Sequence, residues 1–234
     1  MTVGTKVNID GVRDYGAFES NFPLAQVTRA VKGAIRYNPL YDLIFDEQWL
    51  AMDDTHRALE YDISTYTDAG SSADVSSNLG YLTLTTDGTG TDKAGLATMA
   101  AIIDPANLPD LQCEVTLPSV AGVDHKFGFF KDANEYAYFH FDASAATTWY
   151  YKAHDGTTAS SVNTGVTADT SATTLRIAID ENGYVHAWID GVDVTGPALK
   201  ATTTDPMKLY IVTQEEAAAA KTSLTRYFSL VQSR

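Results

Sequence analysis

Apolar and polar residues alternate along short segments over most of the chain after Gly80. In Leu175–Ile179 the large apolar side chains share one side of an extended chain, and Cys113, Val115 and Leu117 do the same within Leu111–Leu117. An alternation of period two is typical of strands that bury one face. The pattern predicts strands at Tyr81–Thr85, Leu96–Ile103, Leu111–Leu117, Phe127–Phe130, Tyr136–Phe141, Thr148–Lys152, Leu175–Ile179, Tyr184–Ile189, Met207–Val212 and Leu224–Val231.

The segments between these strands favour tight turns, as at Asp155-Gly156. Short helical turns are expected only near Ala51–Leu59 and Glu215–Lys221. Tyr41–Trp49 fits either an opening strand or a short helix, and Ser64–Asn78 is polar and rich in turn residues. Many short strands with almost no helix predict an all-β antiparallel sandwich rather than a parallel α/β sheet.

The first 40 residues differ from the rest. Between Leu24 and Arg36 the spacing is helical, and Asn38-Pro39 ends the segment. The predicted helix is amphipathic: its apolar face holds Leu24, Val27, Val31 and Ile35, and its basic face holds Arg29, Lys32 and Arg36. We therefore expect an N-terminal arm at residues 1–40 and a sandwich domain at residues 41–234.

Charge supports this division. Residues 1–40 hold five basic and three acidic residues, which gives +2, while the remainder holds 11 basic and 27 acidic residues, which gives −16. A net charge of −14 argues against nucleic-acid binding, since phosphate contacts require cations. No apolar run is long enough to span a membrane, and the N-terminus lacks the apolar stretch of a signal peptide. A single cysteine, Cys113, excludes an internal disulfide and is expected to be a buried thiol.

Two stretches carry a family resemblance, Phe127–Phe141 and Thr174–Gly191. The second runs from a strand through a four-residue turn into Tyr184–Ile189 and Asp190-Gly191. Over roughly residues 41–234 the chain resembles concanavalin A-like jelly rolls of the laminin G and pentraxin type. With its acidic, Thr- and Ala-rich composition and its short N-terminal arm, the chain resembles tailed-phage virion proteins that decorate capsids or contribute to head fibres.

No catalytic constellation is found. Laminarinase-type members of this superfamily need a Glu-x-Asp-x-x-Glu strand, and the sequence has no match; Glu60-Tyr-Asp62 has only the first spacing. No nucleophile elbow, P-loop or dinucleotide fingerprint occurs. We expect no enzyme activity, no cofactor and no metal. A calcium site at Asp87 and Asp92 is the weaker alternative to an ordinary hairpin loop.

Two aromatic stripes remain, Tyr136-x-Tyr138-x-His140 and Tyr184-x-His186-x-Trp188. They could form one aromatic face on one sheet, and such rings could stack on sugars. His140 and His186 lie on strands that could be neighbours, which would allow a metal pair, but surface or half-buried histidines on an aromatic face explain them better. The alternative is that the rings fill the core or a subunit interface. Tyr136, Tyr138, Tyr184 and Trp188 are the candidate glycan-facing residues.

The resemblance to virion proteins, together with the charge layout, implies a structural virion protein assembled in the host cytoplasm. Its arm would bury Leu24, Val27, Val31 and Ile35 against capsid subunits or a neighbouring copy, and its cations would orient the contact. A homo-oligomer is expected, and a trimer would suit local threefold axes of a lattice. The alternatives for the arm are ordinary packing on the body and, least favoured, binding to membrane or nucleic acid. The alternative function is a lectin-like carbohydrate-binding module.

Overall fold

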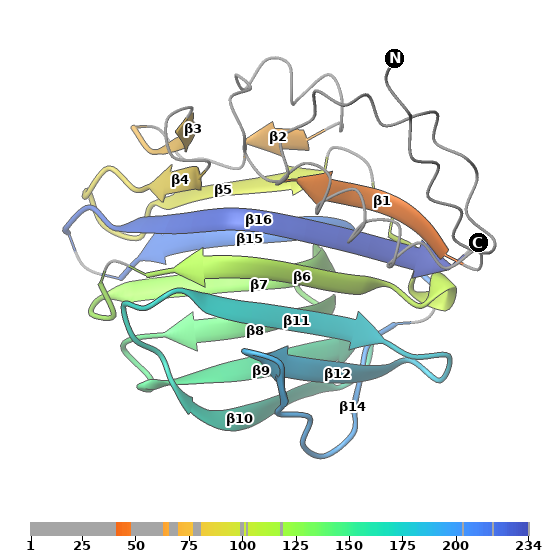
Figure 1. Ribbon diagram of the computed structural model, residues 1–234. Helices are drawn as coiled ribbons and strands as arrows, with labels where there is room; N and C mark the ends of the chain where they lie inside the picture. The colour runs from red at the N-terminus through yellow and green to blue at the C-terminus, as the bar shows by residue number, and fades with distance from the viewer. Residues whose placement is uncertain are drawn as a thin grey trace, which may run out of the picture.

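The computed structural model describes residues 41–47, 63–65, 70–76, 81–98, 101, 103–117, 119–202, 204–216 and 218–233. They form two antiparallel sheets packed face to face (Figure 1). The predicted all-β sandwich is confirmed. The predicted arm, with its candidate docking residues Leu24 to Arg36, lies outside the described residues.

One sheet has seven strands. Their spatial order is β10 (Ala159–Thr167), β9 (Thr148–Asp155), β8 (Glu135–Asp142), β7 (Val123–Asp132), β15 (Lys208–Glu215), β5 (Lys93–Thr98) and β2 (Ile63–Thr65).

The other sheet has nine strands. Its main path is β13 (Val192–Asp193), β12 (Tyr184–Ile189), β11 (Thr173–Ile179), β6 (Asp110–Thr116), β16 (Thr222–Ser233), β4 (Tyr81–Thr85) and β3 (Ser72–Ser76). Off this path, β1 (Tyr41–Glu47) pairs with β16 and β14 (Leu199–Lys200) pairs with β12. A single 3-10 turn, η1 (Pro105–Asn107), precedes β6.

The core lies between the sheets and is made by the alternation seen in the sequence. In β6 and β11 every second side chain is buried, and in β7 and β8 Phe127, Phe129, Phe139 and Phe141 point inward. Cys113 is only 1% exposed, so the expected buried thiol is confirmed. Because each strand commits one face to the core, the other face of each sheet is left for function.

Four local expectations change. Tyr41–Glu47 is a strand, which settles the choice left open there, and Ser72–Ser76 is a strand within a region expected to be turns. Glu215 ends β15, so the helical turn expected from there is wrong for the described residues. The pattern also missed β10, because its Ser, Thr, Asn and Gly residues present almost no apolar alternation. No helix within the described residues is long and apolar enough to cross a bilayer.

Candidate functional site

The outer face of the seven-stranded sheet carries a concentration of aromatic and charged side chains. On β7 the odd-numbered residues from Val123 to Phe129 point into the core, so the even-numbered residues point outward; β8 follows the same rule. Cross-strand register then places these residues in adjacent rows. We call this surface the polar-aromatic face, defined by Asp124, Lys126, Phe130, Tyr136, Tyr138, His140, Tyr150, Lys152, His154 and Tyr210.

Two stacked ring pairs form the aromatic half of this face. Tyr136 and Tyr138 stack with ring centroids 4.6 Å apart, and Phe130 and Tyr210 do the same at 4.6 Å. Tyr138 is 9% exposed and Tyr210 is 7% exposed, whereas Tyr136 and Phe130 are half-buried. Burial raises the pKa of Tyr138, so its phenol stays protonated and can donate a hydrogen bond. Tyr136 therefore presents the more accessible ring of its pair.

Gly128 lies between the two tyrosines in the sheet register, opposite Tyr138 on β8 and Tyr210 on β15. A Cβ atom there would lie 2.4 Å from the carbonyl oxygen of Ala137 and 2.6 Å from the Cα of Tyr138. Both contacts are with backbone atoms, which cannot rotate away. The close approach of β7 and β8 thus requires glycine, and no side chain separates Tyr138 from Tyr210 at this position.

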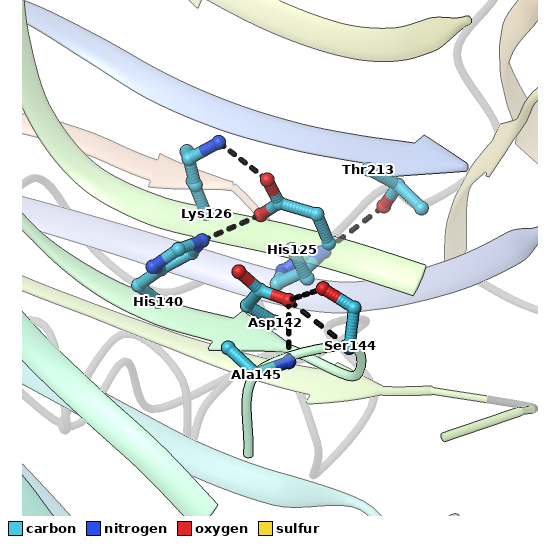
Figure 2. A network of polar contacts seen from close by, with 8 residues as sticks. His125, Lys126, His140, Asp142, Ser144, Ala145 and Thr213 are labelled. Atoms are coloured by element: carbon cyan, nitrogen blue, oxygen red, sulfur yellow. Dashed lines mark hydrogen bonds and ion pairs between the residues drawn. The ribbon is translucent and has the colours of Figure 1, made fainter. Parts of the chain in front are cut away.

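The charged half centres on Asp124. Its carboxylate accepts a hydrogen bond from Lys126 Nζ at 2.7 Å and contacts His140 Nε2 at 2.8 Å, and Figure 2 shows both nitrogens directed at the same carboxylate. Burial by itself raises the pKa of Asp124, but the contact with His140 and the charge of Lys126 outweigh it and lower the pKa. Asp124 is consequently ionised and holds both neighbours in place.

Lys152 is a cation of a different kind. It lies on β9 between Tyr138 and Ser161 in the register. Burial lowers its pKa, which marks partial desolvation of the ammonium group. Within the part of the chain that the structure describes, Lys152 forms no ion pair. Its charge is available to a ligand on the polar-aromatic face.

Asp142 and Glu216 form a carboxyl pair at one end of the face. Burial and the hydrogen bond to Asp142 raise the pKa of Glu216 to about 7. For Asp142, burial by itself raises the pKa, but hydrogen bonds from Glu216, Ser144 and Ala145 N outweigh it and lower the pKa to about 2. Ser144 Oγ donates to Asp142 at 2.7 Å, as Figure 2 shows. The two carboxyl groups therefore share one proton near neutral pH.

His125 adjoins this face in sequence but points the other way, into the core. It is fully buried, its Nδ1 lies 2.9 Å from Thr213 Oγ1, and its ring meets Trp149 edge-on at 6.2 Å. Burial lowers its pKa to about 4, so the ring is neutral at physiological pH. Thr213 Oγ1 in turn contacts Ser223 Oγ on β16, which makes a polar bridge between the sheets.

The second aromatic stripe lies on the other side of the molecule. Tyr184, His186 and Trp188 point outward from β12 in the nine-stranded sheet, whereas Tyr136 and Tyr138 belong to β8 in the seven-stranded sheet. The expectation of one shared aromatic face is therefore wrong, and so is the pairing of His140 with His186. Alternation tells which side of a strand a residue occupies, but it does not tell which sheet receives the strand.

The residues of this second stripe are engaged by neighbouring charges. The Arg176 guanidinium lies 4.3 Å from the Trp188 ring centroid and binds Asp110 through Nε at 2.9 Å and Nη2 at 2.6 Å. Lys200 Nζ lies 4.8 Å from the Tyr184 ring centroid. A hollow of about 710 Å³ opens on this face beside Arg176. Its described lining is Leu108, Asp110, Gln112, Arg176, Ala178, Ile179, Asp180, Glu181, Ser229 and Val231.

The loop that holds Asp87 and Asp92, considered above as a calcium site, lies beside a third acidic residue, Glu215. Oxygen atoms of Asp87, Asp92 and Glu215 all lie within 4.8 Å of one another, and hard cations prefer such ligands. Glu215 is remote in sequence, so spacing could not reveal it. Its Oε2 accepts from Thr86 Oγ1 at 2.8 Å and Gly88 N at 2.9 Å. These bonds give the cluster a structural role in closing the loop.

Comparison with known proteins identifies the fold. No protein-family model and no curated protein matches the sequence. Among solved structures, the Crh5 transglycosylase is similar with a TM-score of 0.60 and 13% identity, over 81% of this chain and 83% of that one. The carbohydrate esterase from Shiga toxin-encoding bacteriophage phi24B gives 0.55 and 17%, over 83% and 100%.

The carbohydrate recognition domain of Emp46p, in its metal-free form, is similar with a TM-score of 0.54 and 8% identity, over 80% of this chain and 95% of that one. All three likenesses are likenesses of fold. They confirm the concanavalin A-like jelly-roll fold expected from the sequence.

Proposed function

We propose that this chain is a non-catalytic glycan-binding domain whose ligand lies on the polar-aromatic face. The observation that carries the proposal is the stacked pair Tyr136–Tyr138 beside the row formed by Asp124, Lys126 and His140. Aromatic rings provide the apolar surface on which a pyranose can stack, and a few fixed polar groups provide orientation and specificity. The carbohydrate-related names of the three similar folds support the same function.

The absence of catalysis is part of this proposal. A retaining glycosidase keeps its two carboxyl groups ~5–5.5 Å apart, with the sugar between them. Asp142 and Glu216 instead interact directly enough to shift each other's pKa, down to about 2 for Asp142 and up to about 7 for Glu216. That contact supports a structural pair rather than an acid and a nucleophile.

A glycan array with the full chain tests the proposal, followed by titration of the best ligand. Tyr136→Ala should weaken binding roughly 10-fold or more, because it removes the accessible stacking ring. Tyr136→Phe should retain most of the affinity. Trp188→Ala is the matched control on the opposite sheet and should leave affinity unchanged. If Trp188→Ala lost affinity for the glycan and Tyr136→Ala did not, the binding site would lie on the outer face of the nine-stranded sheet instead.

Turnover is measured on the same ligands. Product release that disappears in Glu216→Gln would contradict the non-catalytic part of the proposal while leaving the binding site intact.

The second candidate is a structural role in a virion, with residues 1–40 as the docking arm. The supporting observation is the fold shared with a bacteriophage-encoded protein, all of which is covered by the match. Stoichiometric co-purification with a large particle, lost on deletion of residues 1–40, is the expected result. Free protein with no particle association would leave glycan binding as the sole function.

A further inference from the structure

The strand β10 forms an open edge of the seven-stranded sheet. It pairs with β9 on one side and ends the strand order on the other, as Figure 1 shows at the lower margin of the molecule. Residues Ala159–Asn163 pair with β9 in regular register, and a bulge follows before Thr167. Among the described residues, no backbone hydrogen bond joins this segment to any strand or loop except β9. In an edge strand, half of the backbone N–H and C=O groups therefore point toward solvent.

This edge lacks the features that usually protect edge strands. No charged residue occurs between Asp155 and Asp169, in a chain where 20% of the residues are charged. There is also no proline in β10, and its side chains are small or β-branched. Natural sheets commonly block such edges with lysine, proline, bulges or very short strands. Here only the bulge is present, and it leaves Ala159–Asn163 regular.

The other described edges are short or charged. In the nine-stranded sheet, β13 has two residues and includes Asp193, and β3 has five residues and includes Asp74. In the seven-stranded sheet, the opposite edge is β2, with three residues. With nine residues and no charge, β10 is the edge in the described structure that is suited to pairing.

We propose that β10 pairs antiparallel with β10 of a second copy of this chain, so that two seven-stranded sheets join into one. Charge favours this edge as the place where two copies meet. A chain of net charge −14 repels its own copies, and the repulsion is smallest where neither surface carries a charge. Antiparallel pairing of one strand with itself is also the geometry of a twofold interface, in which the same patch serves both subunits.

The proposed β10–β10 pairing can be centred on Ser161. When Ser161 faces its own symmetry mate, Ala159 faces Asn163 and Ser160 faces Val162, so small uncharged side chains meet throughout. Ala159, Ser161 and Asn163 are exposed and lie in the rows of the polar-aromatic face. The dimer would therefore set the two faces side by side in one layer, which would give bivalent binding to a repeating ligand.

Sedimentation of the full chain over a wide concentration range tests the pairing. Edge pairing buries less than the ~1,200 Å² of a standard interface, so we expect a dimer that dissociates on dilution. Ser161→Lys places like charges opposite each other and should weaken association at least about 10-fold. Val192→Lys is the control, because Val192 is 64% exposed on the edge of the other sheet and the substitution adds the same charge. Both variants should melt as the parent does.

Cross-linking then locates the contact. Ser161→Cys should form an intermolecular disulfide on mild oxidation, since directly opposed residues of antiparallel strands bring their Cα atoms within disulfide range. Cys113 is 1% exposed and should not compete. A monomer at every concentration would overturn the proposal and leave this edge to a strand of another protein. Dissociation by Val192→Lys with no effect of Ser161→Lys would overturn it in favour of the other edge.

Discussion

The polar bridge through Thr213 allows a sharp test of the energetics of this sandwich. Thr213 is fully buried, and its hydroxyl contacts His125 Nδ1 at 2.9 Å and also Ser223 Oγ. Thr213→Val keeps the shape of the side chain but removes the hydroxyl. It leaves His125 Nδ1 and Ser223 Oγ without this partner in the interior. Each of these two unsatisfied buried groups costs ~1–3 kcal/mol, so the free energy of unfolding should fall by about 2–6 kcal/mol.

A matched control lies on the opposite sheet, on the strand that carries Ser223. Thr225 is also fully buried on β16, and its Oγ1 has no hydrogen-bond partner. Thr225→Val makes the same chemical change, yet it removes a polar group that is already unsatisfied. It should leave stability unchanged or raise it by about 1 kcal/mol.

Equilibrium unfolding in urea measures both variants, and an unchanged m-value shows that the denatured state is the same. For a domain of this size, a loss of 2 kcal/mol lowers the Tm by roughly 4–8 °C. A free energy of unfolding for Thr213→Val within about 0.5 kcal/mol of the parent chain would refute a stabilising role for the polar bridge. An equally large loss of stability in Thr225→Val would refute it as well.

Three further predictions follow from the described contacts. Glu216 has a folded pKa of about 7, above the ordinary 4.5, so it contributes stability below pH 4.5 that is lost as the pH rises through 7. In Glu216→Gln the Tm should therefore fall less across that pH range than in the parent chain, as thermal melts at several pH values would show. Gly128→Ala should lower the free energy of unfolding by about 2 kcal/mol or more, because the added Cβ meets backbone atoms. In Gly165→Ala the added Cβ has no atom within 4 Å, so only the positive φ should cost stability, about 1 kcal/mol. Equal shifts of the denaturant midpoint in the two variants would contradict the clash at Gly128. Cys113 should resist thiol reagents in the folded chain and react on unfolding, because burial raises its pKa and blocks access.

Much of the sandwich could be predicted from alternation. Tyr81–Thr85 and Tyr184–Ile189 match β4 and β12 in full, and Leu175–Ile179 lies within β11. These strands could be recognised in the sequence because one face of each packs against the core, which requires apolar residues at every second position. The strand β10 was missed for the converse reason: an edge strand with exposed and half-buried side chains has little apolar alternation to detect.

The candidate site was only half visible. Tyr136 and Tyr138 were identified because they alternate along one strand, and the structure shows them stacked. Asp124 and Lys152 were not, since their roles depend on neighbours in β8 rather than on spacing within their own strands.

The sequence by itself determined which residues face the core along most strands, because the two-residue repeat of an extended chain is a local property. Only the tertiary structure decided which strands share a sheet. It therefore decided that Tyr136 and Trp188 point to opposite sides of the molecule, and that Glu215 joins Asp87. The physical reason is that pairing between distant strands is settled by packing of the whole core and by the closure of long loops, and neither is recorded in local periodicity.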